Sequence, residues 1–164
     1  MKKLSLLIIT AFIITTSFAQ KKLYNTSKIN DQHLKIDGNV DDPSWDLVEW
    51  SDDFTQFEPV DGSTPTQKTE IKILYDDNNL YIAFKVYDNE PDKIEKRMSR
   101  RDSWNGDFVT AQIDSYFDKK TAFVFSVNVA GTRSDAISSN DSRHGFDDTW
   151  DPIWNAKTAL TDYG

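Results

Sequence analysis

Two pairs of stretches with largely alternating side chains constrain the fold of this chain more than any other feature. In residues 69–75 and 80–87, and again in residues 108–117 and 122–129, apolar side chains alternate with polar or small ones. A period of two residues is that of a β-strand, whose successive side chains point to opposite faces. Polar turns separate the members of each pair, so each pair predicts an antiparallel hairpin with one buried face.

The second hairpin has two chemically different faces. We expect its apolar face to form core, and this face carries Phe123, Phe125, Val127 and Val129, with Val109, Ala111 and Ile113 on the partner strand. The opposite face is small or polar and carries Thr110, Gln112, Ser126 and Asn128. In the first hairpin, one face is shared by Leu80, Ile82, Phe84 and Val86.

The remaining segments complete an all-β pattern. Asp42 followed by Pro43 predicts the start of one short helix, with a carboxylate cap and proline in the first turn. Further strands are expected at residues 132–137 and 154–160, with a loop between them, while residues 92–101 fit either a short charged helix or an irregular loop. Many short strands separated by turns predict an antiparallel immunoglobulin-like or jelly-roll-type β-sandwich with one short helix.

The N-terminus has the pattern of an export signal. Two lysines precede a short apolar run, and small residues follow at Ser17 and Ala19. We expect a signal peptide at residues 1–19, a polar leader at 20–32 and the sandwich domain at 33–164; the alternative is an N-terminal anchor. Export places the protein in the periplasm, on the outer-membrane surface or outside the cell.

Composition narrows the function classes. The formal net charge is −8, and an acidic chain is poorly suited to binding nucleic-acid backbones. There is no cysteine, so neither a disulfide nor a thiol nucleophile is available. Only His33 and His144 are present, and no nucleophile elbow, P-loop or dinucleotide-binding motif occurs. The composition therefore gives no support for catalysis.

Acidic residues near strand ends are candidates for holding a structural calcium ion. Asp88, Asp102 and Asp107 supply the hard oxygen ligands that calcium prefers. A second acidic loop carries Asp141, Asp147, Asp148 and Asp151. Neither group has the spacing of an EF-hand. The alternative is that both are solvated loops rich in turn-forming Asp and Asn.

Trp104 lies in a charged loop immediately before a strand, where a buried tryptophan is not expected. One explanation is a sugar ligand, because an aromatic ring stacks on the C–H face of a sugar while polar side chains bind its hydroxyls. Trp104 precedes the polar strand face described above and would supply such a platform. The alternative is that Trp104 folds back as a cap on the core.

Several segments, in order and spacing, resemble carbohydrate-binding module family 9. They are Ile36-Asp37-Gly38, Asp42-Pro43-Ser44-Trp45, the strand from Leu80 to Asp88, the run Trp104-x-x-Asp107-x-Val109-x-x-x-Ile113-Asp114, and Phe125-Ser126-Val127-Asn128-Val129-x-Gly131. The closest version resembles the N-terminal module of exported Bacteroidetes-type proteins, in which the module precedes an outer-membrane β-barrel. Arg101-Asp102, Asp114-x-x-Phe117-x-Asp118 and Trp150-Asp151-x-x-Trp154 carry that part of the resemblance.

The resemblance implies a non-catalytic β-sandwich with bound calcium and a slot that grips glucan or xylan chain ends between two tryptophans. It places Trp104 at one wall of the slot and Asn128 as a hydrogen-bonding amide. Thr110 stands where sugar-binding members carry Glu, and Ser126 where they carry Arg. The second wall would lie beyond Gly164, so we expect the domain to lack its C-terminal strands and to be poorly soluble as this fragment.

Our first hypothesis is a carbohydrate-binding module that aids carbohydrate catabolism by a larger parent protein. Trp104 would stack on the sugar, Asn128 and Gln112 would bind its hydroxyls, and Arg100 or Arg101 would reach its rim. Any hydrolase activity would belong to another part of the parent. The alternatives are a periplasmic or surface interaction domain that has lost the sugar slot, and a fragment of an enzyme.

Overall fold

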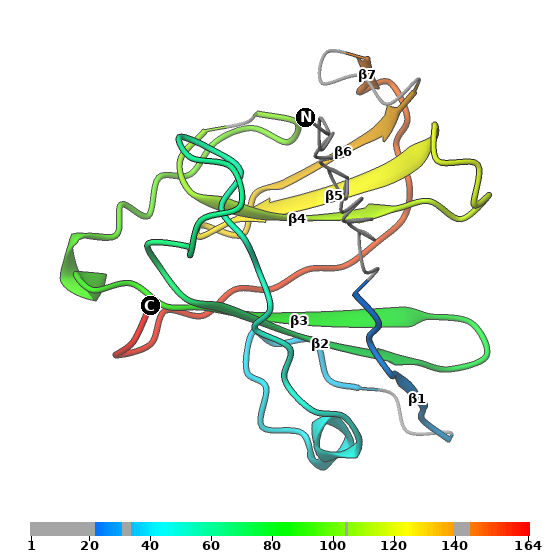
Figure 1. The fold of residues 1–164 in the computed structure, drawn as a ribbon, viewed down its shortest axis with the longest axis horizontal. Coiled ribbons are helices and arrows are strands. Elements are labelled where there is room, and N and C mark those ends of the chain that lie inside the picture. Colours follow the sequence, from blue (N-terminus) through cyan, green and yellow to red (C-terminus); the bar gives the residue numbers. More distant parts are fainter. Residues whose placement is uncertain (1–21, 31–33, 104, 140–144) are drawn as a thin grey trace, which may run out of the picture.

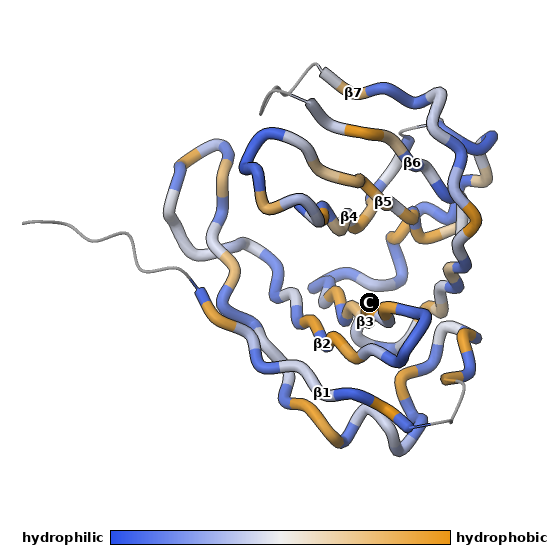
Figure 2. Tube along the Cα trace, turned by 90° about the vertical axis from the view of Figure 1, so that its right-hand side faces the viewer, coloured by the Kyte–Doolittle hydropathy of each residue, from blue (hydrophilic) through white to orange (hydrophobic). Residues whose placement is uncertain are grey.

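The computed structural model describes residues 22–30, 34–103, 105–139 and 145–164, and within them the chain forms two β-sheets (Figure 1). The first sheet has the order β1 (Ser27–Lys28), β2 (Thr69–Tyr75), β3 (Leu80–Val86). The second has the order β4 (Phe108–Ile113), β5 (Ala122–Asn128), β6 (Arg133–Ser138), β7 (Phe146–Asp147). The predicted all-β sandwich is confirmed, and Figure 2 shows hydrophobic residues along the strands of both sheets.

Both predicted hairpins are present, and their registers follow the alternation. Ile73 lies opposite Ile82 in the first, and Ala111 lies opposite Phe125 in the second. The prediction of a purely antiparallel fold is wrong at one edge, where β1 runs parallel to β2. This strand comes from the segment expected to be only a polar leader, and the amide of Ile29 donates to the carbonyl of Tyr75 at 2.8 Å.

The best-buried core lies on one face of the first sheet. Leu74 is fully buried, and Trp45 and Leu34 pack in the same cluster. The short helix expected after Asp42 is a 3-10 helix, η1 (Pro43–Leu47), whose first turn is capped by the Asp42 carboxylate accepting from the amide of Ser44. This helix carries Trp45 onto the sheet, as expected of a core residue.

The burial of the first hairpin differs from the simple apolar pattern. Leu80 and Val86 are 50 % and 42 % exposed, whereas Ala83 on the opposite face is buried. Burial on that face includes Lys72, whose ammonium donates to the carbonyl of Trp45 at 2.6 Å. A lysine can be buried when its aliphatic stem covers apolar surface and its ammonium group has an acceptor. The buried face of this hairpin is therefore the one that η1 covers, not the one with the more apolar side chains.

In the second sheet the predicted core face is also not the most buried one. Phe123, Phe125 and Val127 are half-buried, while the alternate residues Val124, Ser126 and Asn128 are buried. The aromatic face is covered by the C-terminal segment. Trp150 lies 4.8 Å from Phe123 and Trp154 lies 5.3 Å from Phe125, both measured between ring centroids. On the opposite face of β5, the buried Ser126 and Asn128 line the pocket described below.

The segments outside these strands correct three further expectations. Residues 154–160 are not assigned to a strand, although the expected loop before them contributes the short strand β7. A second 3-10 helix, η2 (Pro91–Lys93), begins the stretch for which a helix or a loop was expected, and the rest of it is irregular. Across the described residues, no helix has the length and apolarity needed to cross a bilayer. The predicted signal peptide lies outside the described residues.

Candidate functional site

Ser126 and Asn128 of β5, with Ser134 of β6, line a small polar pocket, and Thr110 of β4 lies beside it. Thr110 and Ser126 lie directly opposite each other on the two strands, and their hydroxyl oxygens are 2.7 Å apart. Ser126 is only 3 % exposed. Because each hydroxyl can act as donor or acceptor, this pair satisfies part of its own hydrogen-bonding capacity without any charged group.

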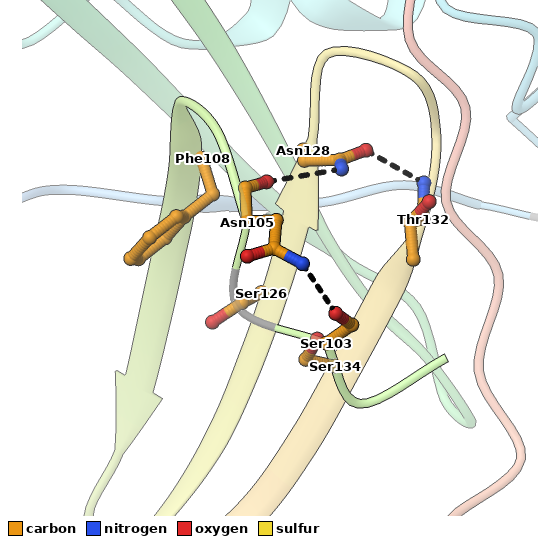
Figure 3. A pocket seen from close by; sticks show the side chains of 7 residues that line it. All are labelled: Ser103, Asn105, Phe108, Ser126, Asn128, Thr132 and Ser134. Atoms are coloured by element: carbon orange, nitrogen blue, oxygen red, sulfur yellow. Dashed lines mark hydrogen bonds between the residues drawn. The ribbon is translucent and has the colours of Figure 1, made fainter. Parts of the chain in front are cut away.

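Three chain segments enclose the pocket, which Figure 3 shows from close by. It is lined by Ser103, Asn105, Phe108, Ser126, Asn128, Thr132 and Ser134. Six of these seven side chains are polar and uncharged. The free volume is about 10 Å³, roughly enough for one water molecule. In this conformation a sugar ring fits only over the mouth of the pocket, not inside it.

Asn128 is held by the turn that follows its strand. Its side-chain oxygen accepts from the amides of Ala130 at 3.0 Å and Thr132 at 2.9 Å. Its side-chain nitrogen donates to the carbonyl of Asn105 at 3.4 Å, as Figure 3 shows. Gly131 completes the turn with a φ of +80°, a backbone conformation that glycine adopts without steric strain. The predicted sugar-binding amide therefore lines the pocket, but its oxygen is already engaged.

The other predicted sugar-binding residues are not gathered at this pocket. Trp104 lies outside the described residues, although its neighbours Ser103 and Asn105 line the pocket. Gln112 and Arg100 are exposed and are not among the lining residues. The position of Arg100 and Gln112 leaves their predicted role untested.

Arg101 is engaged in an ion-pair network rather than at the pocket. Its guanidinium lies 2.7 Å from the carboxylate of Asp135 and 2.5 Å from that of Asp151. Asp135 is 1 % exposed and also accepts from the indole nitrogen of Trp154 at 3.0 Å. The hydrogen bond that Arg101 donates to Asp135 raises the pKa of Arg101, so the guanidinium is held in its charged form.

The predicted calcium ligands are not assembled into a site. Asp102 pairs with Arg101 and accepts from the amide of Asp135, and the carboxylate of Asp88 accepts from the amide of Glu90. In the part of the chain that the structure describes, no three acidic, histidine or cysteine side chains come together as a group that could hold a metal ion. The geometry of Asp88, Asp102 and Asp107 gives calcium no support, and the ion stays a prediction.

Sequence reasoning missed two features of this region. Ser103, Thr132 and Ser134 line the pocket, but short polar residues in turns carry no distinctive signal. Asp135 is a buried acid on a strand face that also carries Arg133 and Ile137, and no motif in the sequence pointed toward it.

Comparison with known families gives one match. A family model described as "Carbohydrate family 9 binding domain-like" matches residues 36–146, which is more than half of the chain and includes β2 to β6. No curated protein and no solved structure matches the chain.

Proposed function

Since the chain belongs to the carbohydrate family 9 binding domain-like family, we propose that it binds poly- or oligosaccharides of the glucan or xylan type without transforming them. A carbohydrate-binding role is what this family supports, and domains of this kind are in general non-catalytic. The proposal adds the ligand type and the position of the site, which is the mouth of the pocket lined by residues of β5, β6 and the loop before β4. In this proposal the domain aids carbohydrate catabolism by a parent protein.

The observation that carries the proposal is the pocket itself. Uncharged hydroxyl and amide groups converge in it from three segments, next to the loop position occupied by Trp104. Sugar recognition requires this combination of an aromatic platform for the C–H face and fixed polar groups for the hydroxyls. The polar groups are fixed because Asn128 and the Thr110–Ser126 pair are held by hydrogen bonds.

The expected contacts follow from which groups remain available. The oxygen of Asn128 is used in the turn and one hydrogen of its amide nitrogen is directed at the carbonyl of Asn105, so the second amide hydrogen is the donor left for a sugar hydroxyl. The Thr110–Ser126 pair offers hydroxyls in place of the Glu and Arg of the sugar-binding modules that the sequence resembles. Hydrogen bonds to charged groups contribute about 1.5–3 kcal/mol each and neutral ones about 0.5–1.5 kcal/mol, so we expect binding weaker than in those modules.

The test is a titration with neutral cello- and xylo-oligosaccharides, followed by tryptophan fluorescence and calorimetry with and without calcium. Trp104→Ala should weaken binding at least tenfold, because a stacking aromatic is a typical anchor of an interface. Tyr116→Ala is the matched control, since Tyr116 is an exposed aromatic at the other end of β4 and should not affect the titration. Equal binding by both variants would remove the site assignment.

A second candidate function is an interaction domain that has lost the sugar slot. The observation favouring it is that Thr110 and Ser126 bond to each other and that Asn128 is engaged by its own turn. If the folded, calcium-loaded protein binds none of the oligosaccharides in the titration, that result would favour this function.

The wider context belongs to the same proposal. We infer export by the N-terminal signal, structural calcium in the acidic loops, and attachment to a following outer-membrane β-barrel. Each has its own readout: signal cleavage after Ala19 on secretion, a calcium-dependent rise in melting temperature, and membrane fractionation of the natural protein.

A further inference from the structure

A second and larger groove lies away from the polar pocket. Its volume is about 430 Å³, within the range of about 300–1,000 Å³ typical of small-molecule sites. The lining residues are Ile36, Gly131, Arg133, Asn155, Ala156 and Lys157. They come from three segments far apart in the sequence, so the groove is a product of the fold.

The walls of the groove are tied together at both ends. Arg133 donates to the carbonyl of Trp154, and its guanidinium lies 5.6 Å from the centre of the Trp154 ring. At the other end the hydroxyl of Thr158 donates to the carbonyl of Val129 at 3.0 Å. Residues 155–157 span the distance between these two anchors. A groove held in this way loses little conformational entropy when a ligand binds.

The charge of the groove is opposite to that of the chain. Two of its six lining residues are cations and none is acidic, although the chain has 27 acidic and 19 basic residues. Neither Arg133 nor Lys157 forms a salt bridge in the described part of the chain. The carboxylates nearest in sequence to the lining residues are Asp37, which pairs with Lys35 at 2.7 Å, and Asp135, which pairs with Arg101 at 2.7 Å.

We propose that this groove binds the carboxylate of an acidic sugar, such as a uronic acid unit of an oligosaccharide. Arg133 presents the planar N–H donors that match a carboxylate, and Lys157 adds a second positive charge. Asn155 supplies an amide for hydroxyls, and Ile36, which is 40 % exposed, supplies apolar surface for the C–H face. The inference rests on the proposed function insofar as the ligand is a saccharide.

The experiment compares three ligands by calorimetry on the natural protein: a xylo-oligosaccharide carrying one glucuronic acid unit, the same oligosaccharide without it, and free glucuronate. Inorganic phosphate and acetate serve as simple anions. The acidic oligosaccharide should bind about tenfold more tightly than the neutral one, and Lys157→Gln should remove that advantage. Lys120→Gln makes the same charge change on the exposed β4–β5 turn and should leave the advantage intact.

The outcomes separate this inference from the proposed function. Equal binding of acidic and neutral oligosaccharides in wild type and Lys157→Gln would overturn the groove assignment while sugar binding at the pocket stands. Glucuronate binding that depends on Lys157, with no binding of neutral oligosaccharides, would support the groove as an acidic-sugar site. The same result would overturn the assignment of the pocket as a sugar site. Phosphate or acetate binding as tight as glucuronate would overturn the acidic-sugar assignment, leaving a simple anion site. Arg133→Gln is a second test of the groove, with circular dichroism to verify folding.

Discussion

The ion pairs of Arg101 allow a test of how the burial of a carboxylate determines what an ion pair contributes to the free energy of unfolding. The guanidinium contacts two carboxylates at nearly the same distance, 2.7 Å to Asp135 and 2.5 Å to Asp151. The side chain of Asp135 is 1 % exposed and that of Asp151 is 74 % exposed. The perturbation is the replacement of Arg101 by Gln, with Asp151→Asn as the matched control.

The expected magnitudes differ because of the carboxylate that each variant leaves behind. Without the guanidinium, the buried carboxylate of Asp135 keeps only the indole of Trp154 as a side-chain donor, and an uncompensated buried charge costs about 3–5 kcal/mol. The Asp151 contact lies in water, where an ion pair contributes about 0–1 kcal/mol. Asp135→Asn should fall between the two, because the cation left behind is partly exposed and still faces Asp151.

The assay is urea unfolding at neutral pH, followed by tryptophan fluorescence, with the midpoints compared at unchanged slope. Arg101→Gln should lower the free energy of unfolding several times more than Asp151→Asn. Equal losses in the two variants would refute the reasoning that burial decides the effect. Oligosaccharide binding measured on the folded fraction then tells whether Arg101 also reaches a sugar, as the sequence suggested.

Two further predictions concern the packing and the charge of the first sheet. Gly38→Ala should lower the melting temperature more than Gly62→Ala. Both glycines have positive φ, but a Cβ at Gly38 would lie 2.8 Å from the backbone of Thr158, whereas a Cβ at Gly62 would meet open space. A reversed order would contradict this packing. The hydrogen bond from Lys68 lowers the pKa of Glu70, so its contribution is present above the ordinary pKa of glutamate and is lost as the pH falls through the lowered value. The stability difference between wild type and Glu70→Gln, from urea unfolding at pH 7 and at pH 3, should therefore close at the lower pH; a difference that widens would contradict the sign.

The strands were predictable because their signal is local. The two-residue alternation of residues 69–86 and 108–129 depends only on neighbouring side chains, and both hairpins appear with the expected pairing. Which face is covered was not predictable in the same way. The polar face of β5 is buried and its phenylalanine face is half-buried because segments distant in the sequence pack on each. Residues 154–160 alternate between exposed and half-buried like a strand, but lack a ladder partner.

The candidate site was predictable only where a residue type is unusual for its position. Asn128, next to a glycine turn, stood out and lines the pocket. The buried Asp135 did not, because its burial depends on Arg101, a residue 34 positions away. Pairings of this kind arise from the fold and leave no periodic trace in the sequence.

The resemblance places a Glu and an Arg where this chain has Thr110 and Ser126, and this difference bears on the proposed specificity. A Glu and an Arg at these opposed positions would be desolvated with the floor of the pocket, and the orientation of their bonds would discriminate between sugars. Each of the two bonded hydroxyls can act as donor or acceptor, so the pair would accommodate several sugar hydroxyl patterns. Under our proposals, discrimination would then come from the stacking platform and from charge outside the pocket. The groove with Arg133 and Lys157 is where such charge is available, so we expect an acid group on the ligand to matter more than the hydroxyl pattern of its ring.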